Sequence, residues 1–401
     1  MPAVTVKGIY DRIHLKITYQ QIVHPDGRVL IFVVPGRPQG SPVHYEGRYW
    51  MRAGEELAPM SPDQLRRIVL EGEKPFVDQP ARNGCSEEEV VTLLDVQSYY
   101  DLRGRPMPST RAEILETFRK KGFLHAHEGG YVITNKGALL FAKRLADFES
   151  VARKGLRMIV YEGRSKLKVR DGKDFTGQRG YAAGFAGLVE YVYDHLPSVE
   201  DSSSALRTTT HAYPKKAIRE VIGNAIVHQD LNEQGMVLRV EIYDDRVEVI
   251  NPGVPILDID RFIDENLSRN EAFADALRQL GICEERGHGM DAVVAALEQH
   301  QLPPYKCRVG TRQTTVILSS YRPLNRLSPE ERVQAVYQHC ALRYATNQIT
   351  NNESLRERFG IDKKNSATAS RLLKEAVEVG RIRPLDVAAG NKLMRYVPYW
   401  A

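Results

Sequence analysis

The chain has few of the residues that mark secreted, membrane-anchored or zinc-binding proteins. Four cysteines occur in 401 residues, and none lies in a C-x-x-C pair. Cysteines scattered in this way predict reduced thiols rather than a disulfide framework or a zinc site. No uncharged apolar run is long enough to span a membrane, and the first residues lack the apolar core of a signal peptide. We therefore expect a cytoplasmic protein without a membrane partner.

The sequence also lacks a phosphate-binding loop of the G-x-x-x-x-G-K-[ST] type and any other helicase motif, so it is not expected to unwind DNA. With 42% hydrophobic and 27% charged residues, its composition is that of an ordinary globular protein. A length of 401 residues predicts two to four domains, and the mixture of strand and helix patterns predicts an α+β multidomain fold.

Positive charge is concentrated near the C-terminus. Residues 321–401 contain 14 Lys and Arg against 8 Asp and Glu, a net charge of +6. Because the whole chain carries +5, the preceding residues carry −1. The basic surplus therefore belongs to this last segment.

A segment from Ala217 to Asn251 contains the strongest candidate site. Its first part predicts an amphipathic helix that begins near Lys215 and buries Ile218, Val221, Ile222, Ala225 and Ile226. Glu220 and Asn224 then lie one turn apart on the same face. A carboxylate that orients or deprotonates water, beside an amide oxygen that binds a metal ion, suits this spacing. An isolated pair of this kind is more often a solvated part of a surface helix.

Further elements follow this helix in a fixed order. Two strands are predicted at Met236–Tyr243 and Arg246–Ile250, and then Asn251-Pro252-Gly253. A helix near Glu271–Leu280 precedes a glycine-bearing segment, Gly287-His288-Gly289, which leads into a helix beginning near Met290. Glycines before a helix N-terminus allow backbone amides to approach phosphate oxygens.

Four segments resemble, in order and spacing, the ATP-binding domain of bacterial RecG-like "divergent AAA" proteins, a branch of the GHKL ATPases: REVIGNAIVHQD, VEVINPGVP, LSRNEAFADALRQLG and EERGHGM. The resemblance implies a GHKL-type, Bergerat-like α/β sandwich that binds ATP and Mg²⁺. It implies that Glu220 is the general base and that Asn224 is the Mg²⁺ ligand. The further nucleotide contacts that it implies are Asn251, Gly253, Arg269, Gly287 and Gly289.

One of these positions departs from the family pattern. Asn251 stands where most GHKL proteins carry an aspartate that binds the adenine amino group, and an asparagine offers a neutral acceptor instead. ATP binding is therefore better supported than ATP hydrolysis. His228 and Asp230 could orient Asn224 or bound water, or His228 could simply end the helix with its ring bonded to a backbone carbonyl. Arg269 could likewise be an ordinary surface arginine.

The N-terminal segment predicts a strand, a loop and a β-hairpin that turns at Glu46–Gly47. A helix is expected to begin at Pro62 with Ser61 as its N-cap. The segment RVLIFVVPGRPQGSPVHYEGRYWMRAGEELAPMSPDQL resembles the second half of the AlbA-like domain found in the same family and in Schlafen proteins. The front half of that domain is not in this sequence, so a separate chain that carries it is a candidate partner.

The residues between these two regions predict helices and one basic strand. Helices are expected at Glu87–Tyr99 and Pro108–Lys121, and a hairpin strand that enters a buried helix at Gly129–Lys143. Five basic residues occur between Arg164 and Lys173. They favour a solvated edge strand, with contact to nucleic acid as the alternative.

The C-terminal segment predicts a helix from Ser328 to about Leu342, two further helices at Glu353–Phe359 and Ala367–Val379, and a hairpin within Arg381–Val397. This order resembles winged helix-turn-helix modules, in which the second helix of the pair enters the major groove of double-stranded DNA. The implied DNA contacts are Lys363, Lys364, Asn365, Ser366, Thr368, Ser370, Arg371 and Lys374, with Arg381, Arg383 and Lys392 on the wing. A winged helix that binds protein, or that forms a homodimer, is the alternative.

The sequence therefore predicts four parts: a partial AlbA-like domain (1–75), a helical connecting region with winged-helix character (76–145), a GHKL-type ATP-binding domain (146–322) and a winged helix (323–401). The first functional hypothesis is a Mg²⁺-dependent ATP-binding protein, possessing slow ATPase activity, that acts as a DNA-binding transcriptional regulator. The second is a DNA-binding or protein-binding regulator whose GHKL fold does not hydrolyse ATP.

Overall fold

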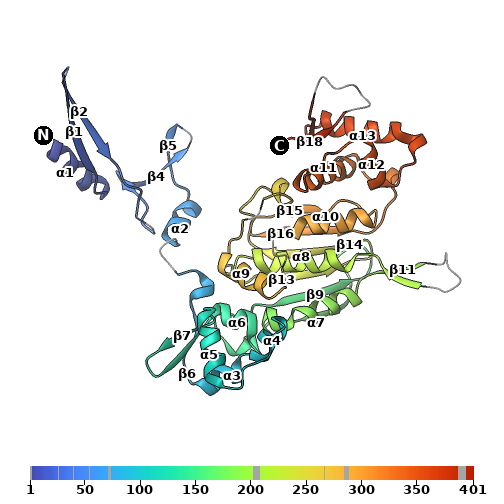
Figure 1. Cartoon of the computed structure of the whole chain (residues 1–401), viewed down its shortest axis with the longest axis horizontal. Helices are drawn as coiled ribbons and strands as arrows, with labels where there is room; N and C mark the ends of the chain where they lie inside the picture. The colour runs from blue at the N-terminus through green and yellow to red at the C-terminus, as the bar shows by residue number, and fades with distance from the viewer. Residues whose placement is uncertain are drawn as a thin grey trace. The chain divides into compact units, whose positions relative to one another are not determined.

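The computed structural model describes residues 2–25, 27–38, 40–53, 55–70, 74–201, 208–265, 267–283, 289–386 and 394–401. The chain divides into two compact units, Met1–Pro75 and Phe76–Ala401 (Figure 1). Among the described residues, no helix combines the length and the apolar character needed to cross a membrane.

The first unit consists of small antiparallel sheets and two helices. Its elements are α1 (Pro2–Ile13), the hairpin β1 (Thr18–His24) and β2 (Gly27–Val33), the three-stranded sheet β3 (His44–Tyr45), β4 (Arg48–Ala53) and β5 (Glu56–Pro59), and α2 (Pro62–Leu70). Glu46 and Gly47 have φ of 49° and 78°, which is the backbone that a two-residue hairpin turn requires. Ser61 Oγ accepts a hydrogen bond from the Gln64 amide at 3.3 Å and caps α2. The predicted hairpin turn and helix start are confirmed.

The second unit begins with a helical layer around a three-stranded sheet. It contains β6 (Pro80–Cys85), α3 (Glu87–Leu93), α4 (Val96–Leu102), α5 (Arg111–Lys120), β7 (Leu124–His127), β8 (Gly130–Thr134) and α6 (Asn135–Phe141), with the sheet order β6-β8-β7. Four buried rings, those of Tyr99, Phe118, Phe123 and Phe141, form its core, with ring centroids 5.2 to 6.1 Å apart. The remaining core includes Leu115, Ile133 and Leu139.

The prediction of one continuous helix at Glu87–Tyr99 is wrong. Leu94 is fully buried and extended, and it pairs with Ala142 as an isolated bridge. Asp95 then accepts a hydrogen bond from the Ser98 amide at 3.2 Å and starts a new helix. The break therefore follows from a long-range backbone pairing together with a local N-cap.

A six-stranded mixed sheet forms the centre of the second unit, with the order β10-β9-β13-β14-β16-β15. The strands are β9 (Leu156–Tyr161), β10 (Val169–Asp174), β13 (Leu238–Ile242), β14 (Arg246–Pro252), β15 (Lys306–Val309) and β16 (Gln313–Ser319). β13 runs parallel to β9, and the other neighbours are antiparallel. The basic segment predicted as an edge strand includes β10, which does lie at the edge of the sheet.

Helices α7 (Tyr181–Asp194), α8 (Lys215–His228) and α10 (Gly289–Gln299) lie along one face of this sheet, and α9 (Glu271–Gln279) lies near the end of α8 (Figure 1). α8 begins after Pro214, as predicted, since a proline is compatible with the start of a helix. Its five predicted apolar positions are all buried, between 0 and 8% exposed. These residues pack toward the sheet and orient the polar residues between them.

The C-terminal part of the second unit contains three helices and a hairpin: α11 (Pro329–Ala345), α12 (Asn352–Phe359), α13 (Ser366–Glu378), β17 (Ile382–Pro384) and β18 (Tyr396–Pro398). A separate small core, including Val336, Leu355 and Leu373, holds the helices together. Ser328 caps α11 in a reciprocal pair of hydrogen bonds with Glu331. The predicted order of three helices followed by a hairpin is present.

Candidate functional site

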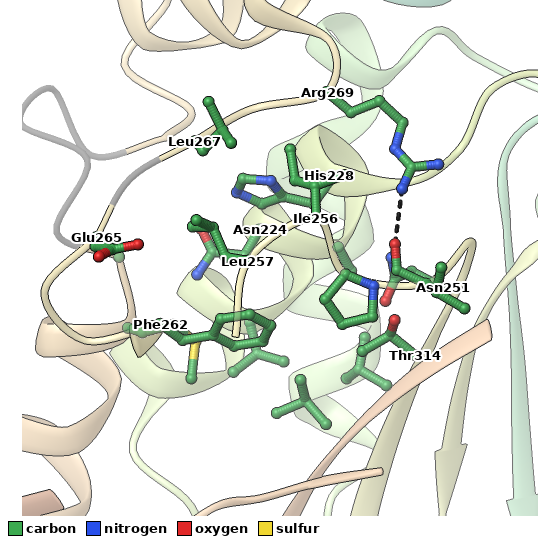
Figure 2. Close-up of a pocket in the computed structure, with 18 residues that line it drawn as sticks. Asn224, His228, Asn251, Ile256, Leu257, Phe262, Glu265, Leu267, Arg269 and Thr314 are labelled. Atoms are coloured by element: carbon green, nitrogen blue, oxygen red, sulfur yellow. Dashed lines mark hydrogen bonds between the residues drawn. The ribbon is translucent and has the colours of Figure 1, made fainter. Parts of the chain in front are cut away.

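A cavity lies between α8, the ends of β14 and β16, and the chain that follows β14. It contains about 870 Å³ of empty space, part of it open to solvent. Polar residues from separate elements face it, and apolar residues from the segment after β14 cover it (Figure 2). The polar lining residues are Asn224, His228, Asn251, Glu265, Arg269 and Thr314, and the apolar ones include Ile256, Leu257, Phe262, Leu267 and Met290.

α8 contributes Asn224 and His228, which are both half-buried and one turn apart. Gly289, the first residue of α10, lies directly against the Asn224 amide. A Cβ atom at position 289 would be 2.6 Å from Asn224 Oδ1 and 2.8 Å from Nδ2. A residue without a side chain is therefore required there for Asn224 to keep its position.

The sheet contributes Asn251 and Thr314, whose Cα atoms are paired across β14 and β16. Asn251 is 8% exposed, and Figure 2 shows both side chains at the sheet side of the cavity. Thr314 Oγ1 donates a hydrogen bond of 2.8 Å to the Gly253 carbonyl. This bond fixes the turn at the point where the chain leaves β14.

Gly253 and Arg269 close this corner of the cavity. Gly253 has φ of 97°, and a Cβ atom there would be 2.7 Å from Asp230 Cβ. Arg269 forms an ion pair with Asp230 and donates a hydrogen bond of 2.7 Å to the Val254 carbonyl. Arg269 lines the cavity, but these partners occupy part of its guanidinium. Arg269 thus joins the end of α8 to the segment after β14.

Burial lowers the pKa of His228 from 6.5 to about 4, and the positive charges of Arg269 and Arg278 add to the effect. The imidazole is therefore neutral at pH 7. A neutral ring can both donate and accept a hydrogen bond, so it adds no charge to the cavity.

Glu220 lies outside the cavity lining, although it is one turn from Asn224. Its side chain is buried, with a residue exposure of 2%, and its Oε1 is 2.5 Å from Arg219 Nη1. Arg219 also donates a hydrogen bond of 2.7 Å to the Gly281 carbonyl. Burial raises the pKa of the neighbouring Cys283 thiol to about 12, and the charge of Glu220 contributes. Glu220 therefore faces the residues that precede the glycine-bearing segment.

The predicted site residues are brought together only in part. Asn224, Asn251, Arg269 and Gly289 line the cavity, and Gly253 borders it through Arg269 and Asp230. Gly287 lies outside the described residues. Sequence reasoning missed Thr314 and the apolar cover. The available signals were the Thr314-Thr315 pair in β16 and the apolar side chains within 254–267. Neither signal is specific by itself.

The predicted DNA contacts lie mainly on one exposed surface of α13 and the short helix before it. Lys363, Lys364, Asn365, Ser366, Ser370, Arg371 and Lys374 are exposed, and Thr368 is half-buried. Arg383 is exposed and donates to the Ala401 carbonyl. Arg381 is different, because its guanidinium is bound by Asp260 through two hydrogen bonds of 2.6 Å. Lys392 lies outside the described residues.

Comparison with known proteins bears on the sheet that carries Asn251 and Thr314. A family model described as "Putative ATP-dependent DNA helicase recG C-terminal" matches residues 235–318, which include β13 to β16. The match does not include α8, and therefore does not include Glu220 or Asn224. A search of curated proteins finds no match.

A solved structure shares the overall fold. The chain is similar to the crystal structure of the DIP2311 protein from Corynebacterium diphtheriae, with a TM-score of 0.50, 18% sequence identity, and coverage of 98% of this chain and 78% of that chain. At this identity the similarity concerns the fold alone. The second unit contains a mixed sheet with helices. Within it, residues 235–318 are similar to an ATPase-type domain described as RecG C-terminal.

Proposed function

We propose that this protein binds ATP together with Mg²⁺ in the cavity beside α8, and that it acts as a DNA-binding transcriptional regulator through residues 323–401. The observation that carries the proposal is the convergence of Asn224, Asn251 and Thr314 from three elements on one mostly apolar cavity. A planar base fits beside apolar side chains, with a few polar groups to fix its orientation. The match of residues 235–318 to an ATPase-type family supports the same ligand.

The residues around Asn224 fit a magnesium site that is completed by a nucleotide. Mg²⁺ in such sites keeps several waters and takes one or two protein oxygens beside the phosphates. The Asn224 amide faces the cavity, and the missing side chain at Gly289 leaves it room. No group of three or more His, Cys, Asp or Glu suited to a metal ion occurs among the described residues, so the phosphates would supply the remaining ligands. Bound Mg²⁺ would neutralise phosphate charge there.

Asn251 and Thr314 are the groups proposed to bind the adenine. Asn251 offers both an amide donor and a carbonyl acceptor, and the Thr314 hydroxyl can accept a second bond while it donates to Gly253. A neutral amide in place of a carboxylate can adopt either orientation toward a base. It therefore supports binding of a purine with less discrimination between adenine and guanine than a carboxylate would give.

Hydrolysis requires Glu220 to reach a water molecule beside the terminal phosphate. Glu220 is paired with Arg219 and does not line the cavity. Catalysis would therefore need this ion pair to open, which is consistent with slow turnover. This observation favours the second candidate function, a regulator that binds ATP but does not hydrolyse it.

The DNA-binding part of the proposal depends on the charge and exposure of α13 and of the short helix before it. Lys363 and Lys364 on the short helix and Arg371 on α13 are exposed. Exposed cations that lie close together in the chain suit a phosphate backbone. The division of the chain at 75, 145 and 322, and a separate chain that completes the AlbA-like domain, are part of the same proposal.

Calorimetric titration with ATP tests the nucleotide site. We expect wild type to bind ATP with Mg²⁺ more tightly than with EDTA, and Asn224→Ala to lose most of this difference. Asn232→Ala, which changes an exposed asparagine just after α8, is the matched control. Absence of any binding to wild type at millimolar ATP contradicts the proposal. Phosphate release that is measurable in wild type and lost in Glu220→Gln decides for the ATPase over the non-hydrolysing regulator.

A further inference from the structure

A second cavity, separate from the nucleotide cavity, lies between the helical layer of residues 76–145 and α9. It contains about 480 Å³ of empty space, part of it open to solvent. The helical layer supplies Arg103 at the end of α4, Lys121 at the end of α5, and Lys136 on α6. α9 supplies Asp275 and Gln279, and the rings of Tyr99 and Phe123 form part of the wall. We call it the Lys136 cavity.

Lys136 is the unusual group in this cavity. It is 9% exposed, although lysine is seldom buried without a partner. Among the described residues it forms no hydrogen bond and no ion pair, and its ammonium nitrogen lies 5.9 Å from the centre of the Phe123 ring. The residue as a whole is therefore largely buried, and it lines the cavity together with Lys121 and Arg103.

Gly122 lies beside the ammonium group of Lys136. It has φ of 68°, and a Cβ atom there would be 2.9 Å from Lys136 Nζ. Glycine suits this backbone conformation, and the absence of a side chain leaves room for the ammonium group where it stands.

Two further cations surround the same space and keep free donors. Lys121 Nζ donates to Gln279 Oε1 at 2.9 Å, and Arg103 donates to the Gln279 carbonyl. Each uses only part of its hydrogen-bonding capacity, since a lysine has three N–H donors and an arginine has five. Asp275 is the one carboxylate among the residues that line the cavity. Its oxygens are directed to Gln279 Nε2 at 2.7 Å and Arg278 at 3.6 Å.

We propose that the Lys136 cavity binds a small phosphate monoester, with Lys136, Lys121 and Arg103 around the phosphate group. Three cations against one carboxylate suit a dianion, and charge-assisted hydrogen bonds to phosphate are strong. The rings of Tyr99 and Phe123 offer an apolar wall to the organic part of the ester. A DNA backbone fits less well, because the Lys136 residue is only 9% exposed and a duplex contacts exposed cations.

Because the cavity joins the helical layer to α9 through Gln279, a bound phosphate would connect these two parts of the second unit. The site shares no lining residue with the proposed ATP site. The phosphate-site proposal can therefore be tested separately from the ATP-site proposal.

The test is thermal unfolding and calorimetry with inorganic phosphate and with phenyl phosphate. Each anion replaces chloride in the buffer while the ionic strength is held constant. We expect both anions to raise the melting temperature of wild type, phenyl phosphate more. Lys136→Met should weaken binding by about tenfold or more, which is the value of one hydrogen bond between charged groups. Lys120→Met is the control, because Lys120 is the last residue of α5, next to Lys121, and its side chain is 69% exposed. This variant should bind both anions as tightly as wild type does. The response should also persist in Asn224→Ala, whose change lies in the other cavity.

A second readout separates ligand binding from a structural role. In chloride, Lys136→Met should be at least as stable as wild type, because it removes one of three cations that line the same cavity. Loss of stability together with unchanged phosphate binding would overturn the proposal. Asp275→Asn supplies an independent variant that should bind phosphate more tightly than wild type, since it removes the repelling carboxylate. Three outcomes contradict the proposal. The first is equal binding by Asp275→Asn and wild type, and the second is absence of binding to wild type at about 10 mM of either anion. The third is a Lys136-dependent response to a DNA duplex alone.

Discussion

Arg381 binds Asp260 through two parallel hydrogen bonds, Nη1 to Oδ2 and Nη2 to Oδ1, each 2.6 Å long. The guanidinium group also lies over the Tyr337 ring, 4.4 Å from its centre. Asp260 belongs to the segment that covers the cavity beside α8, and Phe262, two residues later, lines that cavity. The residue that precedes the first strand of the C-terminal hairpin is therefore attached to the edge of this cavity.

Replacing Asp260 by alanine should loosen the C-terminal part of the chain. The change leaves a half-buried arginine without its bidentate partner. Loss of a charged hydrogen-bonded pair lowers the free energy of unfolding by about 1–3 kcal/mol. We expect faster hydrogen exchange in β17 and α11 and little change in α7. Hydrogen exchange followed by mass spectrometry measures both at once.

The control for this prediction is Arg383→Ala, two residues after Arg381 and within β17. Arg383 is exposed and bonded to the carbonyl of the last residue, so its loss should leave exchange in α11 unchanged. The double variant Asp260→Ala with Arg381→Ala should lose no more stability than the two single variants lose together. Equal effects of Arg383→Ala and Arg381→Ala would show that the ion pair has no special role.

His228 predicts a specific loss of stability in mild acid. Burial lowers its pKa from 6.5 to about 4, so the unfolded chain binds the proton more readily between these pH values. The contribution of the neutral ring is complete above pH 6.5 and is lost as the pH falls toward 4. It amounts to at most about 3 kcal/mol, the product of the shift and 1.36 kcal/mol per unit. Denaturant unfolding at several pH values measures it.

His228→Gln should remove this part of the pH dependence, because glutamine does not titrate. His125→Gln, which changes an exposed histidine on β7, should keep the wild-type profile. If the wild-type and His228→Gln curves run parallel from pH 6.5 to 4, His228 is not protonated on unfolding and the prediction is wrong.

The helices and strands around the cavity were predictable because their causes are local. The apolar spacing of α8 and Pro214 before it set the helix, and the alternation from 236 to 250 set β13 and β14 to within two residues at each end. Serine caps at residues 61 and 328 located two helix starts in the same way. The exception, Leu94, depends on a pairing with Ala142, which no local pattern contains.

The arrangement of side chains was less predictable, because it depends on contacts between distant elements. Helical spacing placed Glu220 and Asn224 on one face, but it could not show that Glu220 pairs with Arg219 and lies outside the cavity lining. The sequence made Arg269 either a nucleotide contact or an ordinary surface arginine, and no local pattern indicated its contacts with Asp230 and the Val254 carbonyl. Arg381 had the charge of a DNA contact, but a carboxylate more than a hundred residues earlier binds it.

Gly289→Ala should weaken Mg²⁺-dependent ATP binding more than it lowers stability. The added Cβ atom would be 2.6 Å from Asn224 Oδ1, a side-chain atom that can move aside. Relief of the contact therefore displaces the proposed Mg²⁺ ligand while the backbone stays in place. We expect about a tenfold loss of affinity for ATP with Mg²⁺, the cost of misplacing one charge-assisted contact, and a melting temperature close to that of wild type.

Gly187→Ala is the matched control for Gly289→Ala. Gly187 lies within α7, and nothing is within 4 Å of a Cβ atom built there. Alanine favours a helix over glycine by about 0.5–1 kcal/mol, so this variant should be slightly more stable and should bind ATP normally. Comparable ATP affinities for the two variants would mean that Asn224 is not a ligand.

Charge on α13 and on the short helix before it should determine the salt dependence of DNA binding. Lys363, Lys364 and Arg371 are exposed, and each phosphate contact contributes about one to the slope of the logarithm of affinity against the logarithm of salt concentration. We expect their triple replacement by alanine to lower affinity for a duplex at every salt concentration and to reduce the slope by about 2–3. Fluorescence anisotropy across a series of salt concentrations measures both quantities.

The matched control is a triple replacement of Arg164, Lys168 and Arg170, which removes the same charge from the exposed segment before and within β10. Because net charge alone can change non-specific binding, the α13 variant must lose more affinity than this control. A larger loss in the control would assign the contact to the segment near β10. A loss that is equal in both would indicate attraction by overall charge, without a DNA-binding surface on α13.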